Sequence, residues 1–135
     1  GDFHGLDRIW RRLSYECGTV LFNLFPLPQS QGFSGSLRYM GRLADADFNI
    51  LIFPEGGHSR DGRMQPFQLG LGIMVKEMGI PVVPIKINGT YQVLPHEASF
   101  PKRGTVTVTF GDPLRFRFEE PEEIVEKTRQ AVEKL

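Results

Sequence analysis

The chain has 135 residues, its 16 lysines and arginines balance its 16 aspartates and glutamates, and it contains a single cysteine. This length suffices for one domain with a sizeable core, and the even charge balance argues against a nucleic-acid partner. One cysteine cannot form an internal disulfide, and no apolar run approaches the roughly 18 residues of a membrane-spanning helix. Cys17 lies four residues after Leu13, a spacing typical of a buried thiol in a helix rather than of a nucleophile.

Hydrophobic periodicity predicts helices that alternate with strands. In the first half of the chain we expect a helix near 6–17, a strand over 20–25, a helix over 34–46 and a strand over 49–53. The second half predicts a helix over 69–78, strands over 82–87 and 105–110, and a helix over 119–135. Gly79 suits a helix C-cap, Pro121 suits a first helical turn, and Pro84 indicates an edge strand or a bulge. The alternation favours an α/β fold, a largely parallel sheet flanked by helices.

A glycine-rich loop follows the predicted strand 49–53, and it concentrates the polar chemistry of the chain. Pro54 ends the strand because proline has no N–H to donate to a ladder, and the residues that follow are Glu55, Gly56, Gly57, His58, Ser59, Arg60, Asp61 and Gly62. Open α/β sheets bind their ligands at the ends of strands, so this loop is the candidate site. Two roles suit Glu55. In the first it binds a ligand, by accepting a hydroxyl or positioning a cation; in the second it accepts hydrogen bonds from backbone N–H groups and makes the turn rigid. These two roles are equally supported.

Other patterns are weaker. Arg60 and Arg63 would either bind a phosphate or be solvated arginines of the loop. Residues 114–118 alternate apolar with basic side chains, a pattern more typical of a half-buried strand than of a membrane contact. His58, Ser59 and Asp61 lie too close together in sequence for a hydrolytic triad, whose members normally converge from separate segments. The three histidines are too scattered for a metal site, so no metal is predicted.

Several ordered motifs resemble the glycerolipid acyltransferase family, which includes the 1-acylglycerol-3-phosphate acyltransferases. Phe53-Pro54-Glu55-Gly56-Gly57-His58-Ser59 is similar to the family's Phe-Pro-Glu-Gly-Thr-Arg-Ser block, and Pro66-Phe67-Gln68-Leu69-Gly70 to its Pro-Phe-Lys-x-Gly block. Ile80 to Ile85, Asn88-Gly89-Thr90 and Phe110 to Leu114 match later blocks in order. The resemblance covers roughly residues 20 to 115. The segment 22–33 looks most like the version fused to acyl-activating ligases.

The resemblance implies an acyltransferase-like fold and the transfer of a fatty acyl group from a thioester to a glycerolipid or lysophospholipid hydroxyl in phospholipid biosynthesis. Family members take their base from a His-x-x-x-x-Asp motif, and no histidine here has an aspartate five positions on. We therefore expect residues 1–135 to be a single, N-terminally truncated acyltransferase domain with no catalytic residue of its own. Its substrate-binding residues are expected to be Glu55, Gly56, Gly57, His58, Ser59, Arg60 and Gln29.

These residues depart from the family pattern in two places. Gly57-His58 replaces the family's threonine and arginine, and Gln29 stands where an arginine is usual. The expected donor is acyl-coenzyme A or acyl carrier protein, as a co-substrate with no further cofactor, and the expected acceptor is a lysophospholipid or a glycerol phosphate. Peripheral contact with the cytoplasmic face of a membrane is also expected. The alternatives are a catalytically silent acyltransferase-like module that binds lipid and, less favoured, a lipid hydrolase that uses Ser59.

Overall fold

The computed structural model describes residues 33–57, 59–96, 98 and 100–135, and the structural statements below concern these residues. The chain divides into two compact units, Gly1–Arg38 and Tyr39–Leu135, and the boundary falls inside the first described helix. The predicted helix near 6–17 and the predicted strand over 20–25 lie outside the described residues, as do Gln29 and His58. The second unit carries the rest of the candidate loop.

Two helices lie where periodicity predicts them. Helix α2 spans Phe33–Asp45, and helix α3 spans Leu69–Met78. Gly79 ends α3 in the left-handed conformation (φ 61°), and its N–H donates to the Val75 carbonyl oxygen at 2.9 Å. Glycine adopts this conformation without the Cβ clash that other residues suffer. The predicted cap at Gly79 is confirmed.

The sheet in the described part of the chain is a single antiparallel pair, β1 (Ile85–Asn88) and β2 (Thr107–Phe110), with Ile85 opposite Phe110 and Asn88 opposite Thr107. An isolated antiparallel bridge, Val82 to Leu114, lies beyond the ladder. Pro84 separates the bridge from β1 because it cannot donate a ladder hydrogen bond, although its carbonyl oxygen accepts from the Gly111 N–H at 2.9 Å. The interruption predicted at Pro84 is confirmed.

The predicted parallel sheet does not occur among the described residues. The segment 49–53 forms no strand there, and Leu51 and Phe53 are each 70% exposed. Sequence pattern reports how well a segment suits a pleated, half-buried surface, whereas a ladder also needs a neighbouring strand to complete its hydrogen bonds. For β1 and β2 the connection, Gly89 to Val106, brings the second strand back antiparallel to the first.

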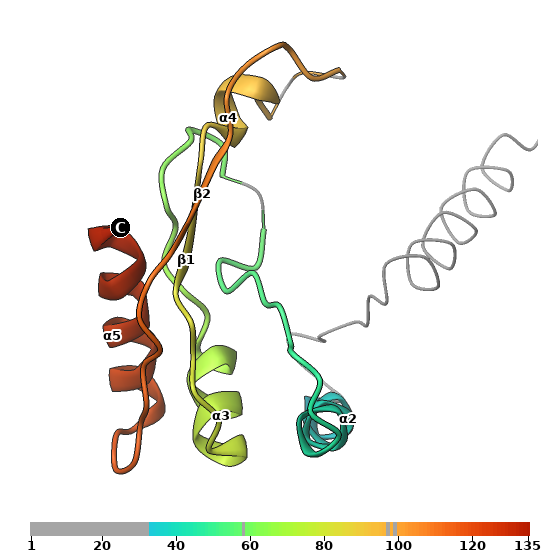
Figure 1. Ribbon diagram of the computed structural model, residues 1–135, viewed down its shortest axis with the longest axis vertical. Coiled ribbons are helices and arrows are strands. Elements are labelled where there is room, and N and C mark those ends of the chain that lie inside the picture. The colour runs from blue at the N-terminus through green and yellow to red at the C-terminus, as the bar shows by residue number, and fades with distance from the viewer. Residues whose placement is uncertain (1–32, 58, 97, 99) are drawn as a thin grey trace, which may run out of the picture. The chain divides into compact units, whose positions relative to one another are not determined.

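The core of the second unit is formed where α3 packs against α5 (Pro121–Lys134), and the two helices lie side by side (Figure 1). Leu71, Val75 and Ile124 are buried at this contact, and it is completed by Phe67, Val82, Phe116 and Val125. Helix α5 begins with a reciprocal capping box between Glu120 and Glu123, with Pro121 in its first turn as predicted. Lys76 of α3 also pairs with Glu120 at 2.5 Å.

The alternating segment 114–118 runs beside α5. Leu114 and Phe116 are half-buried and the intervening Arg115 and Arg117 are exposed, whereas Phe118 is 92% exposed. Phe116 contacts the core cluster, and Leu114 forms the bridge to Val82. The half-burial predicted for this segment is therefore found as far as Phe116, whereas the predicted strand is not, since Leu114 forms an isolated bridge and residues 115–118 are in no strand.

Candidate functional site

The candidate loop opens with a tight turn at Phe53–Gly56. The Gly56 N–H donates to the Phe53 carbonyl oxygen at 3.4 Å, with Pro54 and Glu55 at the two central positions. Proline favours the first central position of such a turn because its φ is already near −65°. Gly56 has φ 72°, in the region where an L side chain is strained. Gly57, the next residue, does not have a positive φ.

Two hydrogen bonds close the loop, the first at its base and the second above it. The Gln68 N–H donates to the Pro54 carbonyl oxygen at 2.8 Å, and the Gln65 N–H donates to Oε2 of Glu55 at 2.6 Å. Glu55 is half-buried, and the second bond spans ten residues of sequence. Pro54 to Gln68 therefore forms a compact loop whose two ends meet. Phe67, just before the closing residue, anchors this end on the core cluster.

A second carboxylate shapes the interior of the loop. Oδ1 of Asp61 accepts the Arg63 N–H at 3.0 Å and the Ser59 hydroxyl at 3.1 Å. The backbone hydrogen bond from Arg63 is the largest influence that lowers the pKa of Asp61, and the Ser59 hydroxyl adds to it. In a hydrolytic triad the serine donates to a histidine and the histidine to the aspartate. Ser59 donates directly to Asp61 instead, so this pair does not form a triad.

The loop also packs against a distant part of the chain. Gly62 has φ 77°, and a Cβ there would lie 2.9 Å from Cγ of Tyr91 in helix α4 (Thr90–Val93). Helix α4 begins immediately after Gly89, whose Cβ position is filled by the Thr105 carbonyl oxygen. The Asn88-Gly89-Thr90 motif thus places Tyr91 against the glycine-rich loop. No local pattern in the sequence connects these two segments.

Of the two loop arginines, Arg60 is the more available to a ligand. Its side chain is exposed and forms no ion pair or hydrogen bond with the described residues. Arg63 lies near Asp61, with Nε 3.9 Å from Oδ2, and both side chains are mostly exposed. Such an exposed pair contributes little to stability. Gly57 borders open space, since no heavy atom lies within 4 Å of a Cβ built there. A ligand can therefore approach the backbone at Gly57 and the guanidinium of Arg60.

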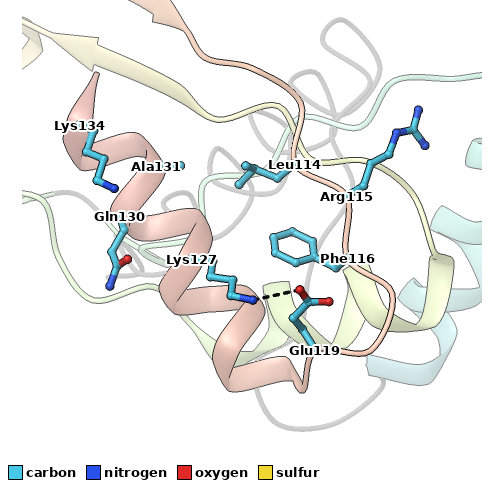
Figure 2. A pocket seen from close by; sticks show the side chains of 8 residues that line it. All are labelled: Leu114, Arg115, Phe116, Glu119, Lys127, Gln130, Ala131 and Lys134. Atoms are coloured by element: carbon cyan, nitrogen blue, oxygen red, sulfur yellow. Dashed lines mark hydrogen bonds and ion pairs between the residues drawn. The ribbon is translucent and has the colours of Figure 1, made fainter.

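A separate open pocket of about 370 Å³ lies between the segment 114–119 and helix α5 (Figure 2). Leu114, Phe116 and Ala131 supply its apolar lining. Within it, Nζ of Lys127 donates to Oε1 of Glu119 at 3.0 Å, while Oε2 accepts the N–H groups of Arg117 and Phe118. The Lys127 hydrogen bond, followed by these backbone bonds, lowers the pKa of Glu119 to about 2.

The described residues contain neither a cluster of ligands suited to a metal ion nor a helix long and apolar enough to span a bilayer. Of the predicted substrate-binding residues, Glu55, Gly56, Gly57, Ser59 and Arg60 are placed together in the loop. Gln29 and His58 are outside the part that the structure describes. The roles predicted for all seven stay predictions.

Comparison with known proteins agrees with the order of the motifs. The model of the Acyltransferase family matches residues 4–88. The chain is 43% identical over 47 residues to the chloroplastic 1-acyl-sn-glycerol-3-phosphate acyltransferase BAT2 of Brassica napus, a match that covers 35% of this chain and 14% of the relative. It is 35% identical over 83 residues to the 1-acyl-sn-glycerol-3-phosphate acyltransferase of Pseudomonas aeruginosa, covering 61% and 32% respectively.

A solved structure is similar as well. The crystal structure of the 1-acyl-sn-glycerophosphate acyltransferase PlsC from Thermotoga maritima aligns with a TM-score of 0.68 and 26% identity, over 73% of this chain and 41% of that one. The chain thus spans less than half the length of each of these three relatives. The family match covers well over half of the chain and includes the turn and the candidate loop. On this evidence, the chain belongs to the glycerolipid acyltransferase family.

Proposed function

We propose that the protein transfers a fatty acyl group from a thioester, on coenzyme A or acyl carrier protein, to the hydroxyl of a lysophospholipid or glycerol-phosphate acceptor. The observation that carries the proposal is the closed loop at Pro54–Gln68, which leaves Arg60 exposed immediately after the block Phe53 to Ser59 that resembles the family's Phe-Pro-Glu-Gly-Thr-Arg-Ser block. The names of the relatives support the same class of reaction. The acceptor and donor are our assignments for this chain.

In the proposed reaction the acceptor hydroxyl attacks the thioester carbonyl carbon, a base removes the hydroxyl proton, and the thiol leaves once the new ester bond has formed. The 135 residues contain no His-x-x-x-x-Asp pair to supply that base. The contribution of this chain is therefore to hold the acceptor. The Arg60 guanidinium is permanently charged and its planar N–H donors match two phosphate oxygens. The backbone at Gly57 offers room for the glycerol close to that charge.

A lysophospholipid acceptor resides in a membrane, so we place the reaction at a membrane surface and propose peripheral association with the cytoplasmic face. The absent base motif also supports a second candidate, a catalytically silent acyltransferase-like module that binds lipid. The two candidates are separated by assaying the protein expressed from its complete coding sequence with both donors and with lysophosphatidic acid. Lipid binding without turnover by either donor would favour the silent module.

Arg60→Ala tests the site within the proposed enzyme. Because a hydrogen bond to a charged group is worth about 1.5–3 kcal/mol, we expect the acceptor KM to rise about 10- to 100-fold, with little change in the donor KM. Arg103→Ala is the matched control, since Arg103 is also exposed but lies outside the loop. Equal acceptor KM values in the Arg60 variant and the unsubstituted protein would exclude Arg60 from phosphate binding.

The two departures from the family pattern make a prediction about the acceptor. Gln29 carries no charge, and His58 lacks the planar guanidinium with which an arginine binds two phosphate oxygens at once. We expect both residues to bind the phosphate of lysophosphatidic acid more weakly than an arginine would, so Gln29→Arg and His58→Arg should each lower the acceptor KM. An acceptor KM that is unchanged in both variants would contradict the prediction.

A further inference from the structure

We infer that Glu55 is a positioning residue that fastens the two ends of the candidate loop, and that it acts on the acceptor through the loop rather than by touching it. This inference rests on the proposed function, because the loop matters only if it holds an acceptor. It separates the two roles that the sequence leaves equally open for Glu55.

Oε2 of Glu55 accepts the Gln65 N–H at 2.6 Å, short even for a hydrogen bond to an ionised acceptor. The side chain is half-buried, and residues 55 and 65 bracket all the polar groups of the loop. A backbone N–H in a loop has no ladder partner, so an internal acceptor supplied by a side chain replaces water and orders the chain. One carboxylate thus sets the separation between the start and the end of the segment that carries Ser59 and Arg60.

Among the ion pairs of the described residues none involves Glu55, so a backbone N–H, and not a cation, is what holds this carboxylate in place. The bond at the base of the loop, from Gln68 to Pro54, involves only backbone atoms. Glu55 is therefore the side chain whose loss opens the loop above that base while leaving the base closed.

The inference predicts which feature of Glu55 matters. Glu55→Gln keeps the reach of the side chain and an oxygen that can accept the Gln65 N–H, but it loses the charge. Glu55→Asp keeps the charge but is one methylene shorter, so it cannot span the distance without moving the backbone. If Glu55 positions the loop, the glutamine variant should be more active than the aspartate variant. If its charge contacts the acceptor, the order should be reversed.

The activity arm uses the protein expressed from its complete coding sequence, with lysophosphatidic acid and acyl-coenzyme A or acyl carrier protein. Displacement of a binding group by about 1 Å can cost on the order of 100-fold, so Glu55→Ala should raise the acceptor KM about 10- to 100-fold and leave the donor KM unchanged. The acceptor KM of Glu55→Gln should stay within about threefold of that of the unsubstituted protein, because its side-chain oxygen still accepts the Gln65 N–H. In an Arg60→Ala background, Glu55→Ala should raise the acceptor KM little further, because the effects of two residues that act as a unit are not additive.

A second arm measures amide hydrogen exchange and does not depend on turnover. The Gln65 amide should be protected in the unsubstituted protein and in Glu55→Gln, and should exchange much faster in Glu55→Ala. The Gln68 amide, bonded to the Pro54 carbonyl, is the internal control and should stay protected in all variants. Loss of protection at both amides in Glu55→Ala would mean that the carboxylate holds the whole loop and not its upper part alone, which would overturn the inference as stated.

The two arms separate the failure of this inference from the failure of the proposed function. If no variant and no form of the protein transfers acyl groups, the proposed function fails, and the exchange of the Gln65 amide still decides whether Glu55 fastens the loop. If transfer occurs but Glu55→Gln is as impaired as Glu55→Ala while its Gln65 amide remains protected, Glu55 touches the acceptor and the positioning role is refuted.

Discussion

Replacing Gly72 with alanine tests the contact that holds α3, and with it the end of the candidate loop, against α5. A Cβ at Gly72 would lie 2.6 Å from the carbonyl carbon and 2.8 Å from Cα of Pro121, and it would overlap the carbonyl oxygen. Carbon atoms in contact normally lie about 3.5–4.0 Å apart, so the start of α5 must move by about 1 Å. The obstacle is backbone, which cannot rotate away as a side chain can.

The magnitude follows from two opposing effects. Alanine gains about 1 kcal/mol over glycine in a helix interior, whereas overpacking a well-packed contact costs about 1–3 kcal/mol or more. Because Leu71, Val75 and Ile124 form the core at this same contact, we take the upper end of that range and expect a net loss of about 2 kcal/mol. For a chain of this size that corresponds to a fall in Tm of roughly 6–10 °C.

Thermal and urea unfolding of the protein and of Gly72→Ala provide the measurement. Gly41→Ala is the matched control, because Gly41 also lies inside a helix but has no heavy atom within 4 Å of the added Cβ. The control should raise stability by about 0.5–1 kcal/mol through helix propensity alone. A Gly72 variant that melts at or above the temperature of the unsubstituted protein would refute the close approach of α3 to Pro121.

Three further predictions concern the loop, the core and the pocket. Gly62→Ala should lower stability and raise the acceptor KM because φ is positive and Tyr91 blocks the added Cβ, whereas Gly57→Ala, whose Cβ meets open space, should leave the free energy of unfolding within about 0.5 kcal/mol of the unsubstituted protein. Thr128 is 4% exposed and its hydroxyl has no partner among the described residues, so Thr128→Val should raise the free energy of unfolding by about 1 kcal/mol, while Thr128→Ser should lower it. The folded-state pKa of Glu119 is lowered from 4.5 to about 2, so its contribution to stability is present above about pH 4.5 and is lost as the pH falls towards 2. Hydrogen exchange of the Phe118 amide, which donates to Glu119, should accelerate over that pH range relative to its intrinsic pH dependence. Glu119→Gln should abolish this pH-dependent change in exchange.

Local chemistry in the sequence was sufficient to predict α2, α3 and α5, whereas the short helix α4 was not predicted. The bounds of α3 and its end at Gly79 follow from hydrophobic spacing and from a glycine that alone adopts positive φ without strain. The start of α5 follows from the capping pair Glu120 and Glu123 with Pro121 between them. These are interactions within a few residues, so the residue types and their spacing are sufficient to predict them. The motif blocks likewise identified the family before any geometry was known.

Tertiary structure decided the strands and the interior of the candidate site. Whether an apolar segment such as 49–53 joins a sheet depends on a neighbour that lies elsewhere in the chain, and the pairing of β1 with β2 runs antiparallel where the alternation of elements favoured parallel strands. Glu55 could be given two roles from sequence because its partner, the Gln65 N–H, is ten residues away. The contact of Gly62 with Tyr91 spans a longer interval still. Contacts between distant residues depend on how the whole chain packs, and residue spacing carries little information about them.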